Sequence, residues 1–269
     1  MTTDEPVIGS TVLRALDAGI LTLTLNRPES ANAIRADQRD AIISALAEAS
    51  ADHEVRVVVL ASTGKHFCSG ADVGGIDPGA QRRVTDTMNR IMSGAQQLIT
   101  AVLDCGKPVI AVVQGTAAGM GAHLALAADL VVASERASFI ESFVLRGLVV
   151  DAGGAYLLPR RVGLQKAKEL VFLGDRLPAA EALQLGLVNH VVPAEQLDAT
   201  AAELAGRLAA LPTSSITLSK RLLNASLDQS RADAFLAEGM AQELQGRSHD
   251  AAEGVAAFKE HRPPEYLGW

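Results

Sequence analysis

The sequence predicts an α/β protein with a parallel sheet in its first part and helices alone in its last part. Two unbroken apolar runs, VRVVVLAS at 55–62 and PVIAVVQG at 108–115, are typical of parallel strands covered on both faces. A long helix is predicted between them at about 81–103, and strands that alternate with helices form parallel sheets. We therefore predict an α/β core over residues 1–194 and a helical C-terminal region over 195–269.

The individual elements follow from periodicity. Residues 11–16 and 20–25 alternate around Asp17-Ala18-Gly19, which indicates a β-hairpin. Apolar residues at helical spacing predict a helix over 37–50. The segments GMGAHLALAAD and LVVAS (130–134) predict a short helix and a further strand. In the last part, helices are predicted near 195–209, 213–225, 231–245 and 248–260.

Composition limits the class of partner. The 269 residues are 48% hydrophobic and only 3% aromatic, which suits a closely packed globular chain. The net charge of −7 argues against nucleic acid and against an anionic membrane surface as the main partner. A polyanionic ligand would therefore need a local cluster of cations.

Cysteines and terminal signals predict a cytoplasmic protein. Cys68 and Cys105 have neither metal-ligand spacing nor a disulfide pattern, which favours a reducing compartment. The opening MTTDEPVIGS lacks the basic and apolar regions of a signal peptide. The longest apolar stretch, 108–133, is interrupted by His123, Asp129 and many glycines, so it predicts a buried core segment and no membrane span.

Two glycine-containing segments could bind an anion through backbone amides. A buried strand ends at Gly115 and a helix starts near Gly119, where first-turn N–H groups lack internal partners. Glycines at 119 and 121 would let an oxygen approach closely, as in an oxyanion hole. The alternative is a helix packed tightly on a sheet. The loop TGKHFCSGADVGG at 63–75 has the same character, although its Asp could simply cap a helix.

Together these segments resemble the crotonase family of enoyl-CoA hydratases and isomerases. The likeness rests on FCSGADV (67–73) and KPVIAVVQGTAAGMGAHLALAADLVVAS (107–134), with ILTLTLNRPESANAI, RGLVVDAGGAYLLPRRVG, GDRLPAAEALQLGLVNHVV and AAFKEHRPPEY in the family's order. The resemblance implies a spiral of ββα units, homotrimers or dimers of trimers, and an acyl-CoA substrate. It implies no prosthetic group and no metal, and it places oxyanion donors at the amides of Ala71 and Met120.

The resemblance also implies coenzyme A contacts. They fall on Glu29, Ala31 and Ala33, on Lys65, His66 and Phe67, and on Phe258 and Lys259. Lys259 and the nearby Arg262 would lie near the adenine and phosphates of a neighbouring subunit's ligand. Segment 76–98, including Ile76, Met88, Met92 and Leu98, is expected to line the acyl pocket.

The reaction is predicted from one acid that is present and two that are absent. Hydratases of the family use two glutamates, whose positions hold His123 and Phe143 here. Asp151 stands where some isomerases of the family carry a catalytic aspartate. Val149, Val150 and Phe143 would partly desolvate it and raise its proton affinity. The alternative is that Asp151 caps a helix beginning near Gly153.

Three further side chains have two interpretations each. His123 could position a water or the substrate, or be a buried core histidine. Glu141 could be a second acid, or form a structural salt bridge. Cys68 is predicted to be a small buried residue, because no activating His–Asp pair is evident. The preferred function is double-bond isomerisation of an enoyl-CoA by Asp151. A hydratase or lyase with non-standard acids and a catalytically silent acyl-CoA-binding protein are the alternatives.

Overall fold

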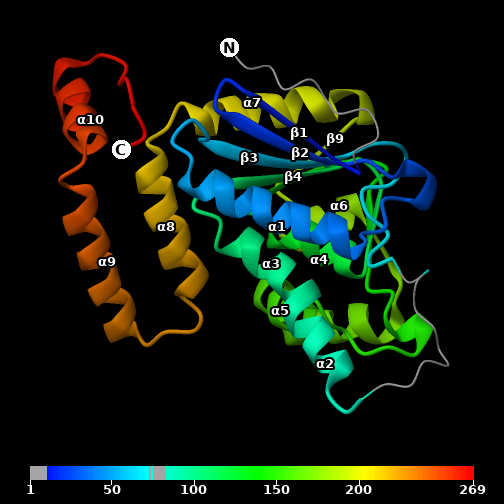
Figure 1. Ribbon diagram of the computed structural model, residues 1–269. Coiled ribbons are helices and arrows are strands. Elements are labelled where there is room, and N and C mark those ends of the chain that lie inside the picture. Colours follow the sequence, from blue (N-terminus) through cyan, green and yellow to red (C-terminus); the bar gives the residue numbers. More distant parts are fainter. Residues whose placement is uncertain (1–10, 73, 75–82) are drawn as a thin grey trace.

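A computed structural model describes residues 11–72, 74 and 83–269 and contains two sheets. The main sheet has six strands in the order β1-β2-β3-β4-β6-β9 (Figure 1). They are β1 (Val12–Asp17), β2 (Ile20–Leu25), β3 (Val57–Ser62), β4 (Val109–Val113), β6 (Leu130–Ser134) and β9 (His190–Val192). Only β1 and β2 are antiparallel. The predicted hairpin and the predicted parallel strands are therefore confirmed.

A second sheet of three short strands lies beside the first. It has the order β5-β7-β8 and consists of β5 (Thr116–Ala118), β7 (Ser138–Ile140) and β8 (Arg176–Pro178). Along the chain, β4 is followed by β5 and α4 (Met120–Ala127), and β6 by β7 and α5 (Gly154–Leu173). Each unit thus places one strand in each sheet before its helix. This is the ββα arrangement that the resemblance implied.

The unbroken apolar run of β3 is explained by cover on both faces. Val58 and Leu60 join the main core, together with residues of α1 (Ala36–Ala51), α3 (Gln96–Leu103) and α4. Val57 and Val59 face the other way, into a smaller cluster with α7 (Leu197–Ala209). In Figure 1 the sheet accordingly lies between α7 and the α1–α3–α4 layer.

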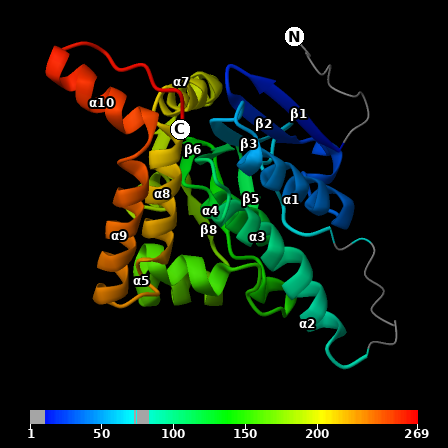
Figure 2. The same cartoon turned by 60° about the vertical axis from the view of Figure 1, so that its left-hand side comes forward.

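The predicted helices of the last part are confirmed to within one or two residues. They are α7, α8 (Thr213–Ala225), α9 (Arg231–Gln245) and α10 (His249–Glu260), with the short α6 (Ala179–Gln184) before them. α7 packs on the sheet, whereas α8 and α9 stand side by side away from it (Figure 2). The division at residue 194 stays a prediction. No helix among the described residues is long and apolar enough to cross a membrane.

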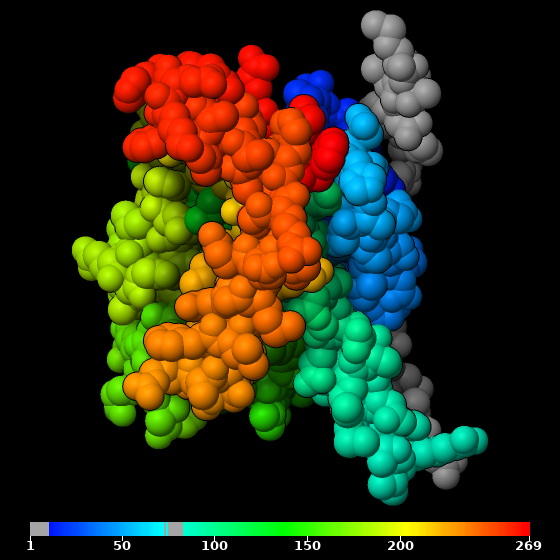
Figure 3. All heavy atoms as spheres, turned by 90° about the vertical axis from the view of Figure 1, so that its left-hand side faces the viewer, coloured from blue at the N-terminus to red at the C-terminus, as the bar shows by residue number. Residues whose placement is uncertain are grey.

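The outer side of this helical region carries many apolar side chains. Figure 3 shows α9 and α10 forming the surface seen from that side. Exposed large apolar side chains on α8–α10 include Leu223, Phe235, Leu236, Met240, Leu244, Val255 and Phe258. Such a surface favours association with another chain.

The helix predicted at 81–103 is present from residue 86 onwards. It consists of α2 (Asp86–Arg90), a π-helical turn η2 (Ile91–Ala95) and α3, without an interruption in the chain. Residues 81 and 82 lie outside the described part. A π turn rotates the following residues relative to a regular helix, and such turns are frequent at functional sites.

Candidate active site

A cavity of about 630 Å³ brings together the three segments that the sequence singled out. Its wall is built from the start of α1, the loop after β3, η2, the start of α4 and the loop before α5. The apolar part of the wall consists of Ile34, Ile91, Ala95, Met120, Phe143 and Leu148. This volume and lining suit a small-molecule site. A larger cavity of about 900 Å³ between α3, α5 and α8 contains none of the predicted site residues.

Ala71 and Met120 both line this cavity. The Ala71 amide makes no hydrogen bond to another described residue. In the β-bridge between Ala71 and Ile34, the Ile34 N–H donates to the Gly70 carbonyl, and the Asp72 N–H donates to the Ile34 carbonyl. Met120 is the first residue of α4, where an amide has no acceptor within the helix. Two unused donors therefore border one cavity.

Glycines allow the two amide-bearing segments to approach each other. A Cβ on Gly70, whose φ is +108°, would lie 3.0 Å from the Ala118 carbonyl oxygen and 3.7 Å from the Met120 nitrogen. Gly121 has a different role from the expected one. Its Cβ would lie 2.3 Å from the Cys68 carbonyl oxygen, so its missing side chain makes room for the other loop and not for a ligand.

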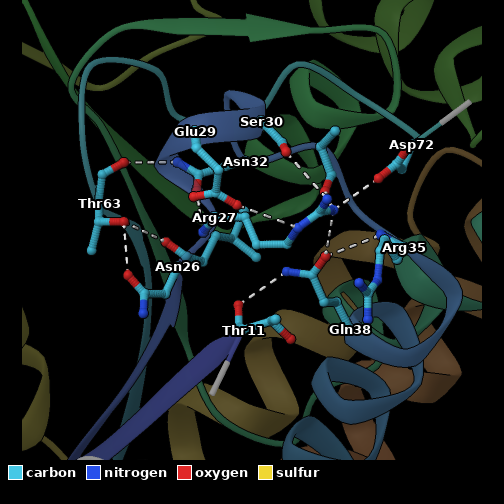
Figure 4. Close-up of polar contacts among 12 residues, drawn as sticks. Thr11, Asn26, Arg27, Glu29, Ser30, Asn32, Arg35, Gln38, Thr63 and Asp72 are labelled. Carbon is cyan, nitrogen blue, oxygen red and sulfur yellow. Dashed lines mark hydrogen bonds and ion pairs between the residues drawn. The ribbon is translucent and has the colours of Figure 1, made fainter. Parts of the chain in front are cut away.

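An arginine network fixes the loop between β2 and α1 to the cavity wall (Figure 4). Arg27 Nη1 lies 2.8 Å from Asp72 Oδ2 and donates to the Ala33 carbonyl at 2.9 Å. Asp72 also accepts from the Gly74 amide, and these two donors, the Gly74 amide first, lower the pKa of its carboxyl. Asp72 is therefore engaged in structure, although it lines the cavity.

Asp151 is the other carboxylate on the cavity wall among the described residues, and it is unpaired. Its side chain makes no hydrogen bond or ion pair with another described residue. Partial burial raises the pKa of its carboxyl, while nearby His123 and Arg90 act in the opposite direction. The expected contribution of Val149 is wrong, because that side chain is 83% exposed; Leu148 is the neighbour on the wall.

The capping alternative for Asp151 is also wrong. α5 begins at Gly154 and has Gly153 as its N-cap, without a side-chain hydrogen bond to the cap. Only the main chain of Asp151 takes part in the turn, since its carbonyl accepts from the Gly154 amide at 2.9 Å. The carboxylate is left to the cavity.

His123 is fully buried and does not line the cavity. Its Nε2 lies 2.9 Å from Glu141 Oε2, and Phe143 stacks on the ring with centroids 5.5 Å apart. The Nδ1 atom has no partner among the described residues. The salt-bridge interpretation of Glu141 is confirmed, and a direct contact between His123 and a ligand is not supported by its position. Burial also raises the pKa of the Cys68 thiol to about 12, which agrees with an inert cysteine.

Of the residues expected to bind coenzyme A near the first helix, Ala33 lines the cavity, next to Ser30. Ala31 is in the left-handed conformation that ends the short helix Pro28–Ser30, and Glu29 lies 3.8 Å from Arg27. Neither Glu29 nor Ala31 is on the cavity wall.

The second expected loop contributes differently. Lys65 is exposed, and the His66 carbonyl accepts from Asn32 Nδ2 at 2.8 Å, which joins this loop to the first. The expectation of ligand contact is wrong for the Phe67 side chain, because it is fully buried in the core. Only main-chain atoms of Phe67 remain for such a contact.

The C-terminal residues lie apart from the cavity within one chain. Phe258 is 80% exposed on α10, and Lys259 follows it. Arg262 pairs with Glu253 and Glu260, so it is partly neutralised. A role for these residues in a neighbouring subunit's site stays a prediction.

Sequence reasoning missed the cations of the cavity wall. Arg35, Arg39, Arg90 and Arg146 all line it. The acyl-pocket expectation selected the wrong side of the 76–98 segment: Met88 and Met92 are exposed, Leu98 is in the core, and Ile76 lies outside the described residues. Arg90, Ile91 and Ala95 face the cavity instead. Arg90, Ile91 and Ala95 are one and four positions apart, and this helical spacing was the signal in the sequence that indicated a shared face.

Comparisons with known proteins show the family and the fold. The Enoyl-CoA hydratase/isomerase family model matches residues 15–268. A "Probable enoyl-CoA hydratase" of Rhodobacter capsulatus is 36% identical over 96% of this chain and 98% of its own length. The 1,2-epoxyphenylacetyl-CoA isomerase of Escherichia coli K12 is 35% identical, with the same coverage of both chains. A crystal structure of an enoyl-CoA hydratase/isomerase from Cupriavidus metallidurans superposes with a TM-score of 0.90 at 33% identity, over 100% of this chain and 98% of that chain.

Proposed function

The chain belongs to the enoyl-CoA hydratase/isomerase family, and we propose that it shifts a carbon–carbon double bond in an enoyl-CoA with Asp151 as its single acid and base. The observation that carries this proposal is the state of the carboxylates on the cavity wall. Asp72 is bonded to Arg27 and to the Gly74 amide, whereas Asp151 has no partner among the described residues.

One carboxylate is sufficient for an isomerisation. Asp151 removes a proton from the carbon next to the thioester carbonyl, and the electron pair of that C–H bond forms an enolate. The developing oxyanion accepts hydrogen bonds from the amides of Ala71 and Met120. The protonated Asp151 then returns the proton to the carbon two positions further along, and the double bond shifts by one carbon toward the thioester carbonyl. Nothing is consumed, so no co-reactant is needed.

The two amides provide the electrostatic part of this mechanism. Removing one oxyanion donor typically costs about 3–4 kcal/mol of transition-state stabilisation. Asp151 contributes proton transfer, and partial burial suits it to this role because a raised pKa makes the carboxylate a stronger base. His123 acts on Asp151 without touching the substrate. It is hydrogen-bonded to Glu141 and lies close enough to Asp151 to lower the pKa of that carboxyl.

Water addition needs a second acid or base that activates the water or protonates the acyl carbon, and the described cavity wall offers no second free carboxylate and no histidine. Glu141 is buried and paired with His123. The hydratase and lyase alternatives would therefore require Asp151 to perform both tasks alone. The silent-binder alternative leaves the unpaired carboxylate unexplained.

Exchange of Asp151 for Asn tests the proposal. Incubation of a 3-enoyl-CoA with the protein in D₂O should give the 2-enoyl isomer, with deuterium incorporation followed by NMR. In Asp151→Asn, isomerisation and exchange should fall by a factor of 10² or more, in the range of general acid–base contributions, while the affinity for the thioester stays within about threefold. Asp198→Asn, on the exposed face of α7, is the matched control. Full activity of Asp151→Asn would reject the assignment, and hydration of a 2-enoyl-CoA would favour the alternative.

We also propose that the chain works as a homotrimer, or a dimer of trimers, in a reducing cytoplasm. The exposed apolar side chains of α8–α10 support the association, and the two free cysteines support the compartment. Phe258 and Lys259 would then reach a neighbour's coenzyme A. Sedimentation of the purified protein as a monomer would contradict the assembly.

A further inference from the structure

The charges of the cavity wall do not balance. Four arginines line it, and two of them form solvent-exposed ion pairs near the start of α1: Arg35 pairs with Asp37, and Arg39 lies 2.8 Å from Asp40. The other two, Arg90 and Arg146, form no ion pair with any described residue.

The two unpaired arginines line the same cavity as the proposed catalytic acid. Arg90 ends α2 directly before Ile91, and its charge influences Asp151. Arg146 ends the short helix Val144–Arg146, five residues before Asp151, and both arginines line the cavity with it.

A hydrogen bond holds Arg146 at the cavity wall. Arg146 Nη1 donates to the Ser142 carbonyl at 3.1 Å. Ser142 lines the cavity, and its hydroxyl lies 3.4 Å from the position a Cβ on Gly119 would take, at the residue before Met120. Arg146 is thus held by the main chain of a residue on the cavity wall.

We propose that the acyl group of the substrate carries a carboxylate at its far end, which Arg90 and Arg146 bind. The proposal rests on the proposed function and specifies its substrate class. Both arginines are exposed in the free protein, and an entirely apolar acyl group in the cavity would displace part of their water and offer no hydrogen-bond acceptor in return. A guanidinium and a carboxylate instead form charge-assisted, frequently bidentate hydrogen bonds. The two positive charges also offset the repulsion between a substrate carboxylate and Asp151.

The competing use of these arginines is to bind the phosphates of coenzyme A. The first helix already offers cations near the predicted coenzyme A loop, because Arg35 and Arg39 line the cavity together with Ser30 and Ala33. Arg146 is five residues before Asp151, and Arg90 lies close enough to influence its carboxyl, so both belong to the part of the cavity where the proposed mechanism places the acyl carbons.

Saturated thioesters bind without being isomerised, so their affinities distinguish binding of an acyl carboxylate from binding of the coenzyme A phosphates. Isothermal titration calorimetry would compare glutaryl-CoA with pentanoyl-CoA, adipyl-CoA with hexanoyl-CoA, and coenzyme A alone. The members of each pair have the same number of acyl carbons and differ in the terminal carboxylate. We expect the wild-type protein to prefer at least one dicarboxylic thioester by tenfold or more. In Arg90→Gln and Arg146→Gln this preference should fall below about threefold, while coenzyme A binds as before. Arg207→Gln, exposed on α7, should keep the preference.

Two outcomes would overturn the inference and leave the proposed function standing. One is equal affinity of the wild-type protein for both members of each pair. The other is an equal loss of affinity for all five ligands in the arginine variants, which would assign these residues to the phosphates. Failure of every thioester and of coenzyme A to bind the wild-type protein would instead remove the proposed function itself.

Discussion

Replacing Gly154 by alanine would place a methyl group where the imidazole of His123 lies. The added Cβ would be 2.2 Å from His123 Cε1, 2.3 Å from its Nε2 and 2.7 Å from Val150 Cγ2. Ordinary contacts begin near 3.4 Å, so the ring would have to move by about 1 Å. The ring cannot do so without loss, because Glu141 holds Nε2 at 2.9 Å and Phe143 stacks on its face.

The cost can be worked out from these contacts. Overpacking of a buried site costs about 1–3 kcal/mol, and loss of a hydrogen bond to a charged group costs about 1.5–3 kcal/mol. Alanine recovers up to about 1 kcal/mol, because glycine is a poor helix former. We therefore expect Gly154→Ala to lower the free energy of unfolding by about 2–4 kcal/mol. In a chain of this length, that corresponds to a fall in Tm of roughly 5–15 °C.

Urea denaturation and thermal melting, each followed by circular dichroism, would measure the effect. Gly154→Ala in a His123→Ala background separates the clash with the imidazole from other effects of the substitution, because the space that the ring occupies is then open. There we expect Gly154→Ala to cost less than about 1 kcal/mol, and hence a coupling energy of at least about 1–3 kcal/mol. A wild-type melting temperature for Gly154→Ala, or an equal loss in both backgrounds, would refute the reasoning.

Three further predictions concern named charges. Lys220→Met should destabilise the protein by about 3 kcal/mol in urea titration, because it removes a buried ammonium group and leaves the partly buried Asp129 carboxylate, 2.8 Å from Lys220 Nζ, without its ion-pair partner. Asp72→Asn should weaken acyl-CoA binding several-fold in calorimetry, since Arg27 loses an ionic contact that fixes the loop before α1. The pH profile of kcat/KM should rise through an acid limb above the usual range of an aspartate, because the base must be ionised and burial raises the pKa of Asp151. Because the pKa of Asp151 is higher in the folded than in the unfolded protein, folding disfavours the ionised carboxylate. The contribution of Asp151 to the free energy of unfolding is therefore present at low pH and is lost as the pH rises through the folded pKa. At pH 7, Asp151→Asn should be at least as stable as the wild type in urea titration.

The local sequence pattern was sufficient to predict strands that are buried on both faces and helices whose apolar residues recur over several turns. The β3 run was predicted as a strand because Val57 and Val59 meet α7 while Val58 and Leu60 meet the main core. The helices of the last part were predicted almost to the residue, since their apolar residues recur at helical spacing over three or more turns. The three-residue strands of the second sheet were missed, because a period of two cannot be recognised over so few residues.

The candidate site was only partly predictable. The resemblance and the glycines indicated Ala71 and Met120, and both border the cavity with unused amides. Asp151 was selected by motif position, and the structure places it on the same wall. The side of the 86–103 helix that faces the cavity was predicted wrongly, since a π turn at Ile91–Ala95 changes which residues lie on one face.

The sequence by itself determined the fold class, the helical last part and the absence of the two usual glutamates. Those properties depend on residue type and on spacing along the chain, which are local. Only the tertiary structure decided that Glu141 is engaged by His123, 18 residues away, that Asp72 is engaged by Arg27, 45 residues away, and that Asp151 and two arginines of the cavity wall form no ion pair with any described residue. Charges pair through space, so which of them remain free for chemistry depends on how the chain folds back on itself.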